Sequence, residues 1–184
     1  MDGEGFCFFE THIGVCAIAW RGQAIIAVQL PEETPQRTRA RMQRRADATA
    51  QAPPPPHVRA IIERVKALLE GERDGMLDVP LDMQGVPPFH QRVYEIARAI
   101  PPGRTLTYGE VATKLGDPGS ARAVGQALGH NPFAPIVPCH RVLAADGQGG
   151  GFSANGGVAT KLRMLQIERA RFGAAPGLFD DQPA

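Results

Sequence analysis

The chain has 184 residues, which is room for one large domain or two small ones. Hydrophobic residues make up 43% of it and charged residues 21%, proportions that exclude a low-complexity chain and allow a sizeable core. No stretch approaches the roughly 18–20 apolar residues of a membrane span, which excludes membrane insertion. The three cysteines cannot all pair with one another, and Met1–Trp20 lacks the pattern of a secretory leader, so we expect a reducing, cytoplasmic location.

The net charge of +1 hides an asymmetry between the two halves of the chain. Residues 87–172 carry ten Lys or Arg against five Asp or Glu, a net charge of +5. Residues 1–86 carry ten against twelve, a net charge of −2. This difference indicates that the C-terminal half faces a polyanion.

Three short apolar runs rich in β-forming residues open the chain: Phe6–Phe9, Gly14–Trp20 and Ala24–Leu30. With a turn at residues 21–23, they predict a small antiparallel meander. Apolar side chains at helical spacing predict a helix over Val58–Glu70, which Gly71 ends. A returning strand is expected at Met76–Leu81.

The segment Pro31–Pro56 interrupts this pattern with an arginine-rich run at residues 37–45 and four consecutive prolines at 53–56. An arginine run of this kind is found in solvated helices and in clusters that bind nucleic acid. We expect the whole segment to be an exposed, loop-like connection, with polyproline character at the four prolines.

From residue 87 the pattern changes to helices separated by short turns: Phe89–Ile100, Thr107–Leu115 and Ser120–Gly129. Thr107 followed by Glu110 is a capping-box pattern. The second and third helices, joined by a tight turn at residues 117–119, have the form of a helix-turn-helix. The third helix carries one charge, Arg122, among small residues. Either Arg122 probes a closely approached surface or it is a solvated side chain on a tightly packed helix, and the composition favours neither.

The segment Asn131–Leu143 carries the chemistry that the sequence suggests. Three prolines stiffen the approach to Cys139, which is followed by His140 and Arg141. Two cationic neighbours favour the thiolate, the reactive form of cysteine. If these residues lie in a strand, His140 points away from the sulfur and a water bridges the two groups. The alternative, a small buried hydrophobe, explains neither the prolines nor the cationic pair.

Downstream, three consecutive glycines at 149–151 allow the backbone to approach a planar ligand. Phe152 and Ser153 then offer an aromatic wall and a backbone donor. A helix begins at Gly157 and carries Glu168 in its later turns, where a glutamate can reach back to a histidine.

Four motifs occur in order at close spacing: Arg104–Ala112 (RTLTYGEVA), Ala121–Gly125 (ARAVG), Asn131-Pro132 and Pro138–Val142 (PCHRV). Over about residues 89–168 the chain resembles the methylated-DNA–protein-cysteine methyltransferases, also called O6-alkylguanine-DNA alkyltransferases. The resemblance implies an α/β fold in two domains. Residues 1–86 would form a small ribonuclease-H-like α/β domain that includes the Pro/Arg-rich connection at about 31–57. Residues 87–172 would form the mainly helical DNA-binding and catalytic domain with a helix-turn-helix, and 173–184 a flexible tail.

The resemblance also implies a function, DNA repair by direct damage reversal. The protein would bind double-stranded DNA, flip out O6-alkylguanine (and O4-alkylthymine), and transfer the alkyl group irreversibly to Cys139 in a single turnover. His140 would be the base that deprotonates Cys139 through water, and Glu168 would orient His140. The chemistry requires no metal or organic cofactor, and we expect a monomer.

By the same resemblance, Arg122 fills the space that the flipped base leaves, Tyr108 rotates its phosphate, and Asn131 is the hinge between the recognition helix and the active-site loop. Tyr108 or Lys161 would protonate the leaving guanine. The remaining pocket residues implied are Ser153, Phe152, Leu128 and Ala134.

The chain departs from the family pattern at two places. Phe152 stands where the family usually has tyrosine, and the segment Ser153–Lys161 is about two residues longer than usual. We expect the loop to absorb the insertion, because the helix that follows keeps its spacing to Glu168.

Two other functions have to be considered. Some relatives with tryptophan in place of the cysteine only bind damaged bases and present them to other repair factors, and Cys139 argues against that class. A thiol hydrolase built on Cys139 and His140 would leave the helix-turn-helix unused. Near the N-terminus, Cys7, His12 and Cys16 lie close enough in sequence to suggest zinc, but alternation along strands favours packed, metal-free cysteines.

Overall fold

The N-terminal half of the chain builds a three-stranded antiparallel meander, which confirms the prediction. The computed structural model describes residues 3–46, 50–145 and 157–170. β1 (Glu4–Thr11) pairs with β2 (Gly14–Arg21), and β2 pairs with β3 (Ala24–Gln29). Gly22, in the turn between β2 and β3, has a φ of 57°, a conformation that glycine adopts without strain.

The prediction of a loop after β3 is wrong, because residues 35–45 form helix α1 (Pro35–Arg45). The Oγ1 atom of Thr34 accepts a hydrogen bond from the backbone N–H of Arg37 at 3.2 Å, so Thr34 caps the first turn. Pro35 stands at the start of the helix, where the missing N–H costs nothing.

Helix α1 is held to the sheet by one stripe of side chains. Thr38, Met42 and Ala46 follow one another at a spacing of four residues, and all three are buried. Met42 and Ala46 pack against Phe6 and three alanines of the sheet. The prediction was wrong because the arginines dominate the composition of this segment, whereas the short buried stripe decides its structure.

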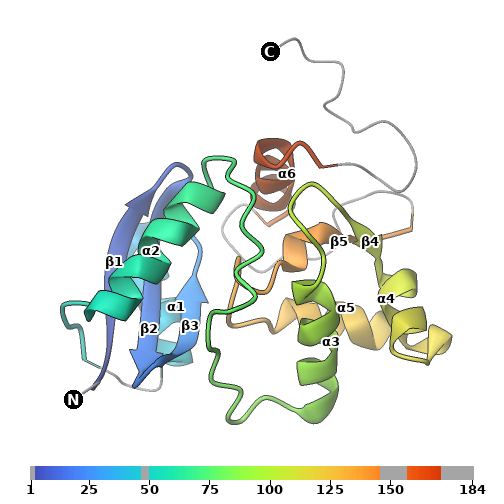
Figure 1. Cartoon of the computed structure of the whole chain (residues 1–184), viewed down its shortest axis with the longest axis horizontal. Coiled ribbons are helices and arrows are strands. Elements are labelled where there is room, and N and C mark those ends of the chain that lie inside the picture. Colours follow the sequence, from blue (N-terminus) through green and yellow to red (C-terminus); the bar gives the residue numbers. More distant parts are fainter. Residues whose placement is uncertain (1–2, 47–49, 146–156, 171–184) are drawn as a thin grey trace.

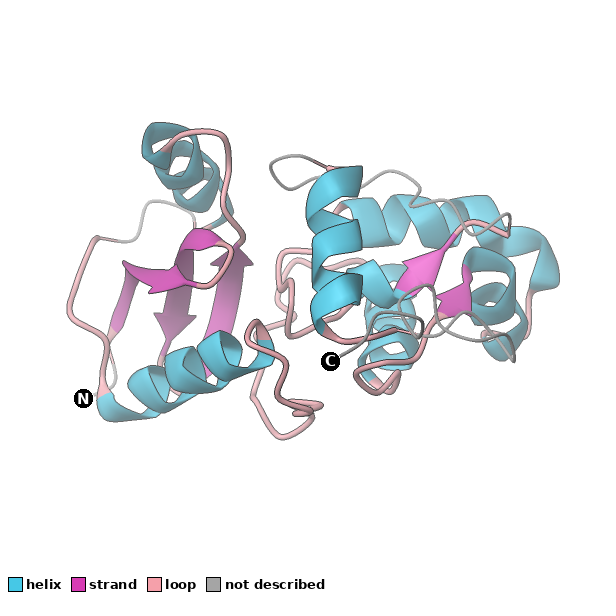
Figure 2. Ribbon diagram, turned by 90° about the horizontal axis from the view of Figure 1, so that it is seen from above, coloured by secondary structure: helices cyan, strands magenta, loops and turns pink. Residues whose placement is uncertain are grey.

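A second helix, α2 (Pro56–Leu68), matches the expected helix and covers the opposite face of the sheet from α1 (Figure 2). Its buried side chains are Val58, Ile61, Ile62, Val65 and Leu68. Gly71, with a φ of 106°, follows the helix end as the sequence suggested.

No strand forms at Met76–Leu81, where one was expected. Leu81 makes only an isolated parallel bridge with Ile25 of β3. The carbonyl oxygens of Met76 and Val79 instead accept hydrogen bonds from Nη2 of Arg98, at 2.8 and 2.6 Å. The side chain of Arg98 therefore satisfies two carbonyl groups that a strand would use for hydrogen bonds to its neighbouring strand.

The C-terminal half is mainly helical, as predicted. Its elements are α3 (Pro88–Arg98), β4 (Leu106–Thr107), α4 (Tyr108–Lys114), the 3-10 helix η1 (Pro118–Ser120), α5 (Ala121–Gly129), the 3-10 helix η2 (Cys139–Arg141), β5 (Val142–Leu143) and α6 (Val158–Ile167). Thr107 caps α4 by accepting a hydrogen bond from the N–H of Glu110 at 3.0 Å, as the sequence pattern predicted. β4 and β5 pair in parallel and bring the start of α4 beside the segment that follows Cys139.

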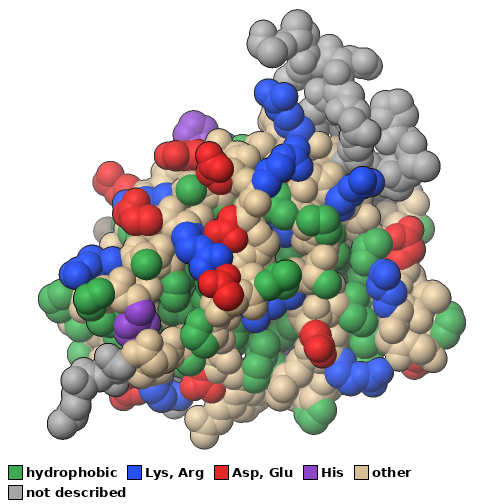
Figure 3. Space-filling view, viewed as in Figure 1, with side chains coloured by type: hydrophobic (Ala, Val, Ile, Leu, Met, Phe, Trp, Pro, Cys, Tyr) green, Lys and Arg blue, Asp and Glu red, His purple; other side chains and the backbone are tan. Residues whose placement is uncertain are grey.

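The two halves lie side by side, with the sheet and its helices on one side and α3–α6 on the other (Figure 1). One large hydrophobic cluster runs through both, from Ile18 and Val65 to Tyr94 and Phe133. On the face shown in Figure 3, acidic and basic side chains are interspersed over the N-terminal half. Within the described residues, no helix is both long and apolar enough to cross a membrane.

The cap of α1 leads to the first prediction. Replacing Thr34 by alanine removes the acceptor for the N–H of Arg37, and we expect the free energy of unfolding to fall by about 1 kcal/mol. Urea denaturation measures this loss. Thr34→Ser keeps the hydroxyl and is expected to retain most of the stability; an equal loss in both variants would contradict the cap.

Candidate active site

The segment from Asn131 to Cys139 is held in place by hydrogen bonds at both ends. Nδ2 of Asn131 donates to the carbonyl oxygen of Val137 at 2.8 Å, and its Oδ1 accepts from the N–H of Phe133 at 2.9 Å. From the N-terminal half, the N–H of Val28 at the end of β3 donates to the carbonyl oxygen of Pro132 at 2.8 Å. Asn131 is itself buried, so these bonds are shielded from water and rigidify the approach to Cys139.

Cys139 begins the 3-10 helix η2, not a strand. Three prolines precede it, and its own N–H donates to the carbonyl oxygen of Val137 at 2.9 Å. The helical turn therefore replaces the alternation of side chains on which the sequence argument about Cys139 and His140 relied.

The Cys139 thiol is buried, with 6% of the residue exposed. Burial raises its pKa, against the opposing effects of a hydrogen bond with Asn131 and of the positive charges on Lys161 and Arg45. The expectation that the adjacent His140 and Arg141 make the thiolate the favoured form is wrong, because burial dominates, burial also lowers the pKa of His140, and Arg141 pairs with Glu168. The thiol needs a proton acceptor to react.

The next two side chains, His140 and Arg141, share one carboxylate, that of Glu168 (C-cap of α6). Nε2 of His140 lies 2.8 Å from Oε1 of Glu168. Arg141 donates to both carboxylate oxygens, from Nε at 3.0 Å and from Nη2 at 2.7 Å, and its Nη1 donates to the carbonyl oxygen of Ile100 at 2.8 Å. All three side chains are buried. Glu168 thus reaches His140, as the sequence predicts.

This network sets the charge of its members. Burial alone would raise the pKa of Glu168, but His140 and Arg141 outweigh burial and hold that pKa well below its usual range. Burial lowers the pKa of His140, with Glu168 opposing, so the imidazole is neutral near pH 7. A carboxylate only accepts hydrogen bonds, so Nε2 carries the proton and Nδ1 keeps its lone pair. Nδ1 is buried and has no hydrogen-bond partner among the described residues.

Lys161 and Tyr108 lie together on another side of the site. Nζ of Lys161 donates to the carbonyl oxygen of Val142 at 2.6 Å and lies 5.7 Å from the centre of the Tyr108 ring. Burial lowers the pKa of Lys161 to about 8, while it raises the pKa of Tyr108. Lys161 is therefore a proton donor suited to neutral pH.

Helices α4 and α5 present a different surface. Arg122, in the first turn of α5, is exposed and has no hydrogen-bond or ion-pair partner in the described part of the chain. A Cβ atom on Gly125 would lie 3.9 Å from Cε1 of Tyr108, so the small residues of α5 allow close packing against α4. Val124 and Leu128 face inward and are buried.

The other predicted residues fall into two groups. Leu128 and Ala134 belong to the same hydrophobic cluster as Cys139. Phe152 and Ser153, with the three glycines before them and the tail 173–184, lie outside the described residues.

At the N-terminus, Cys7 and Cys16 are buried in the sheet as free thiols. Across residues 3–46, 50–145 and 157–170, no group of three His, Cys, Asp or Glu side chains is placed to hold a metal ion.

Sequence reasoning missed two groups that act on the Cys139 thiol from a distance. Arg45, at the end of α1, lowers its pKa, and the charge that the thiol takes on as thiolate raises the pKa of the buried Tyr94 of α3. The sequence held no local signal for either contact, because both residues come from remote elements. The sequence predicts Arg141 as a neighbour that activates Cys139, whereas in the structure its guanidinium holds Glu168.

The shared carboxylate leads to the second prediction. Glu168→Ala leaves Arg141 and His140 buried without their partner, and we expect a loss of roughly 3–5 kcal/mol in the free energy of unfolding near neutral pH. Because the folded-state pKa of Glu168 lies below its unfolded value, its contribution is present above about pH 4.3 and is lost as the pH falls.

Urea denaturation measures this loss, and Glu63→Ala is the matched control. Glu63 pairs with Lys66 at the surface, so its removal is expected to leave the unfolding midpoint nearly unchanged. Equal effects of the two substitutions would contradict the structural importance of the buried network.

Comparison with known proteins places this geometry in a family. Residues 88–170 match the family described as 6-O-methylguanine DNA methyltransferase, DNA binding domain. The chain is 37% identical to the methylated-DNA–protein-cysteine methyltransferase of Mycobacterium tuberculosis, over 93% of this chain and 96% of the relative. It is 47% identical to a DNA base-flipping protein of Thermus thermophilus, over 59% of this chain and 71% of that protein.

Among solved structures, Mycobacterium tuberculosis OGT in complex with DNA matches with a TM-score of 0.73 at 34% identity, covering 92% of this chain and 96% of that one. Two observations point to the same family. The relatives match over nearly their whole length, and the PCHRV segment carries a histidine that is paired with a buried carboxylate. The chain belongs to the methylated-DNA–protein-cysteine methyltransferase family.

Proposed function

We propose that this protein repairs DNA by transferring the alkyl group of O6-alkylguanine irreversibly to Cys139. The observation that carries the proposal is the Cys139–His140 pair on η2, in which a buried thiol is followed by a neutral imidazole oriented by Glu168. Family membership supplies the class of reaction.

In the proposed reaction, the proton of the Cys139 thiol passes to Nδ1 of His140, directly or through one bridging water. Glu168 stabilises the imidazolium that forms. The thiolate then attacks the alkyl carbon in line with the C–O6 bond, so an S–C bond forms as the C–O6 bond breaks. The thioether is stable, and each protein molecule reacts once.

The electron pair of the broken bond leaves with guanine, which requires a proton. Lys161 is the better donor of the two candidates, because its pKa of about 8 lies nearer neutral pH than the raised pKa of Tyr108. The resulting neutral lysine stays hydrogen-bonded near Val142, and solvent restores its proton after the product leaves.

For access to the base, we infer that α4, η1 and α5 form a helix-turn-helix that binds double-stranded DNA. Arg122 is exposed on α5 and unpaired within the described residues, and it would fill the gap left by the flipped nucleotide. Tyr108, at the start of α4, would rotate the phosphate of that nucleotide. Asn131, which ends the connection from α5, would couple this movement to the active-site segment.

The remaining parts of the proposal follow from this assignment. Leu128 and Ala134 would border the pocket for the base, with Phe152 and Ser153 completing it. Residues 1–86 would form a ribonuclease-H-like supporting domain, for which the antiparallel meander with a helix on each face is the support. A monomer is sufficient for the reaction, since every proposed group belongs to one chain.

The alternative is a protein that binds alkylated bases without reacting. The similarity to a DNA base-flipping protein over 108 residues is compatible with both functions. The Cys139 thiol with its adjacent imidazole favours transfer, because binding alone needs neither group.

The third prediction tests the acceptor. After incubation with a duplex that contains O6-methylguanine, we expect a mass gain of one methylene on the peptide with Cys139, and none in Cys139→Ser. DNA affinity should remain largely intact, because the hydroxyl occupies nearly the same volume. Cys7→Ala, which removes a buried thiol of the sheet, is the control and is expected to react normally. Tight binding without a mass gain in the unaltered protein would favour the alternative.

The fourth prediction tests Arg122. Arg122→Ala should slow transfer from duplex DNA about tenfold or more, because each 1.4 kcal/mol lost from the flipped state costs a factor of ten. Transfer from free O6-benzylguanine has no gap to fill and should be nearly unchanged. Stopped-flow or quench measurements on both substrates separate these effects, and equal losses on both would remove Arg122 from base flipping.

A further inference from the structure

The last residue of α1, Arg45, connects the N-terminal half to the candidate active site. Its side chain is half-buried, and Nη1 lies 3.3 Å from the carbonyl oxygen of Val28, to which it donates. The N–H of the same residue, Val28, donates to the carbonyl oxygen of Pro132 in the segment that leads to Cys139. Arg45 is therefore tied to the residue of β3 that holds this segment.

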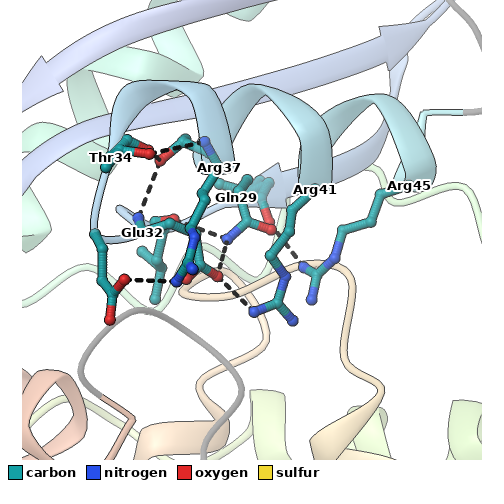
Figure 4. A network of polar contacts seen from close by, with 10 residues as sticks. Gln29, Glu32, Thr34, Arg37, Arg41 and Arg45 are labelled. Atoms are coloured by element: carbon teal, nitrogen blue, oxygen red, sulfur yellow. Dashed lines mark hydrogen bonds and ion pairs between the residues drawn. The ribbon is translucent and has the colours of Figure 1, made fainter.

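The arginines on this side of α1 differ in their partners. Arg37, Arg41 and Arg45 follow at a spacing of four residues and extend from the same side of the helix (Figure 4). Arg37 pairs with Glu33, and Arg41 pairs with Glu32. No carboxylate forms an ion pair with Arg45 within the described part of the chain, so its charge is not neutralised by direct contact.

The charge of Arg45, which has Glu32 and Arg41 as charged neighbours on its own side of α1, acts on Cys139. Arg45 and Cys139 interact electrostatically in the direction that favours the thiolate. The pKa of the buried Tyr94 of α3 responds to both groups, since Cys139 raises it and Arg45 lowers it. We propose that Arg45 is a positioning residue for alkyl transfer, whose guanidinium stabilises the Cys139 thiolate from the N-terminal half of the chain. This inference rests on the proposed function and adds a residue to it.

Several other groups face Cys139 from the elements around it. Lys161 comes from α6, Tyr94 from α3 and Tyr108 from α4, while Asn131 donates a hydrogen bond and His140 is the neighbour in sequence. Tyr94 and Tyr108 are neutral near pH 7, as phenols ordinarily are, and burial raises the pKa of each further.

The two cations have different tasks. The pKa of Lys161 is about 8, so it is partly neutral near pH 8 and, in the proposed reaction, gives its proton to the leaving guanine. An arginine stays protonated at every pH at which the protein functions. Arg45 thus supplies a constant positive potential, whereas that of Lys161 varies with pH and disappears when its proton is transferred.

The fifth prediction tests this role with three substitutions in the full-length protein. Arg45→Met removes the charge at nearly constant length, Arg45→Lys retains it, and Arg44→Met removes the charge of the adjacent, exposed arginine. Transfer from free O6-benzylguanine is measured against pH, because this substrate excludes effects on DNA binding. Thermal unfolding confirms that the variants are folded.

We expect Arg45→Met to move the midpoint of the pH–rate profile to higher pH by about half a unit or more, which is a roughly threefold slower transfer near neutral pH. The direction follows from the charge, since removing a cation disfavours the thiolate. Arg45→Lys should lie between Arg45→Met and the unaltered protein, and Arg44→Met should leave the profile in place. An unmoved profile in Arg45→Met, or equal shifts in Arg45→Lys or Arg44→Met, would overturn the proposal.

A second measurement separates this inference from the proposed function. Ultraviolet thiolate absorbance is titrated in the unaltered protein and in Arg45→Met, each minus its Cys139→Ser counterpart. If transfer fails but Arg45→Met raises the thiol pKa, the proposed function is wrong, while the stabilisation of the Cys139 thiolate by Arg45 stands. If transfer occurs and the two thiol titrations coincide, Arg45 has no such role and the proposed function stands.

Discussion

The buried carboxylate of Glu168 is the interaction on which the site depends. It joins three segments that are distant in sequence: the end of α6, the η2 turn with His140 and Arg141, and, through Arg141, the carbonyl oxygen of Ile100 after α3. Removing three such groups from water is costly, so the network contributes position more than stability. It selects the tautomer of His140 and leaves Nδ1 as the acceptor for a proton.

A raised thiol pKa suits a protein that reacts once. A cysteine with a permanently low pKa is exposed to oxidation and to reaction with unrelated electrophiles. Burial keeps Cys139 protonated, while the neutral imidazole and the positive charges of Lys161 and Arg45 are placed to support the thiolate as it forms. In the proposed reaction, the bound base and the proton acceptor together determine when the sulfur is reactive.

The N-terminal half contributes to this site through two contacts that share one residue. The N–H of Val28 donates a hydrogen bond to the carbonyl oxygen of Pro132, and the carbonyl oxygen of Val28 accepts one from the guanidinium of Arg45. The large hydrophobic cluster continues from the sheet into α3 and the active-site segment, so the sheet and that segment are packed as neighbours. The small sheet and its two helices are thereby part of the environment of Cys139.

The sequence by itself determined the elements with strong local signals and pointed to the residues that we propose to react. The meander, the cap of Thr107 on α4 and the Pro-Cys-His-Arg-Val motif were predictable because each depends on residues close together in the chain. Helix α1 was missed because its buried stripe is short beside its many arginines, and the strand at 76–81 was wrongly expected because Arg98 takes its carbonyl groups. Only the tertiary structure decided that burial raises the pKa of Cys139, that Arg141 pairs with Glu168, and that Arg45 bonds to the residue of β3 that holds Pro132. Desolvation and long-range charge interactions arise from packing between distant segments, and no local pattern of residues encodes them.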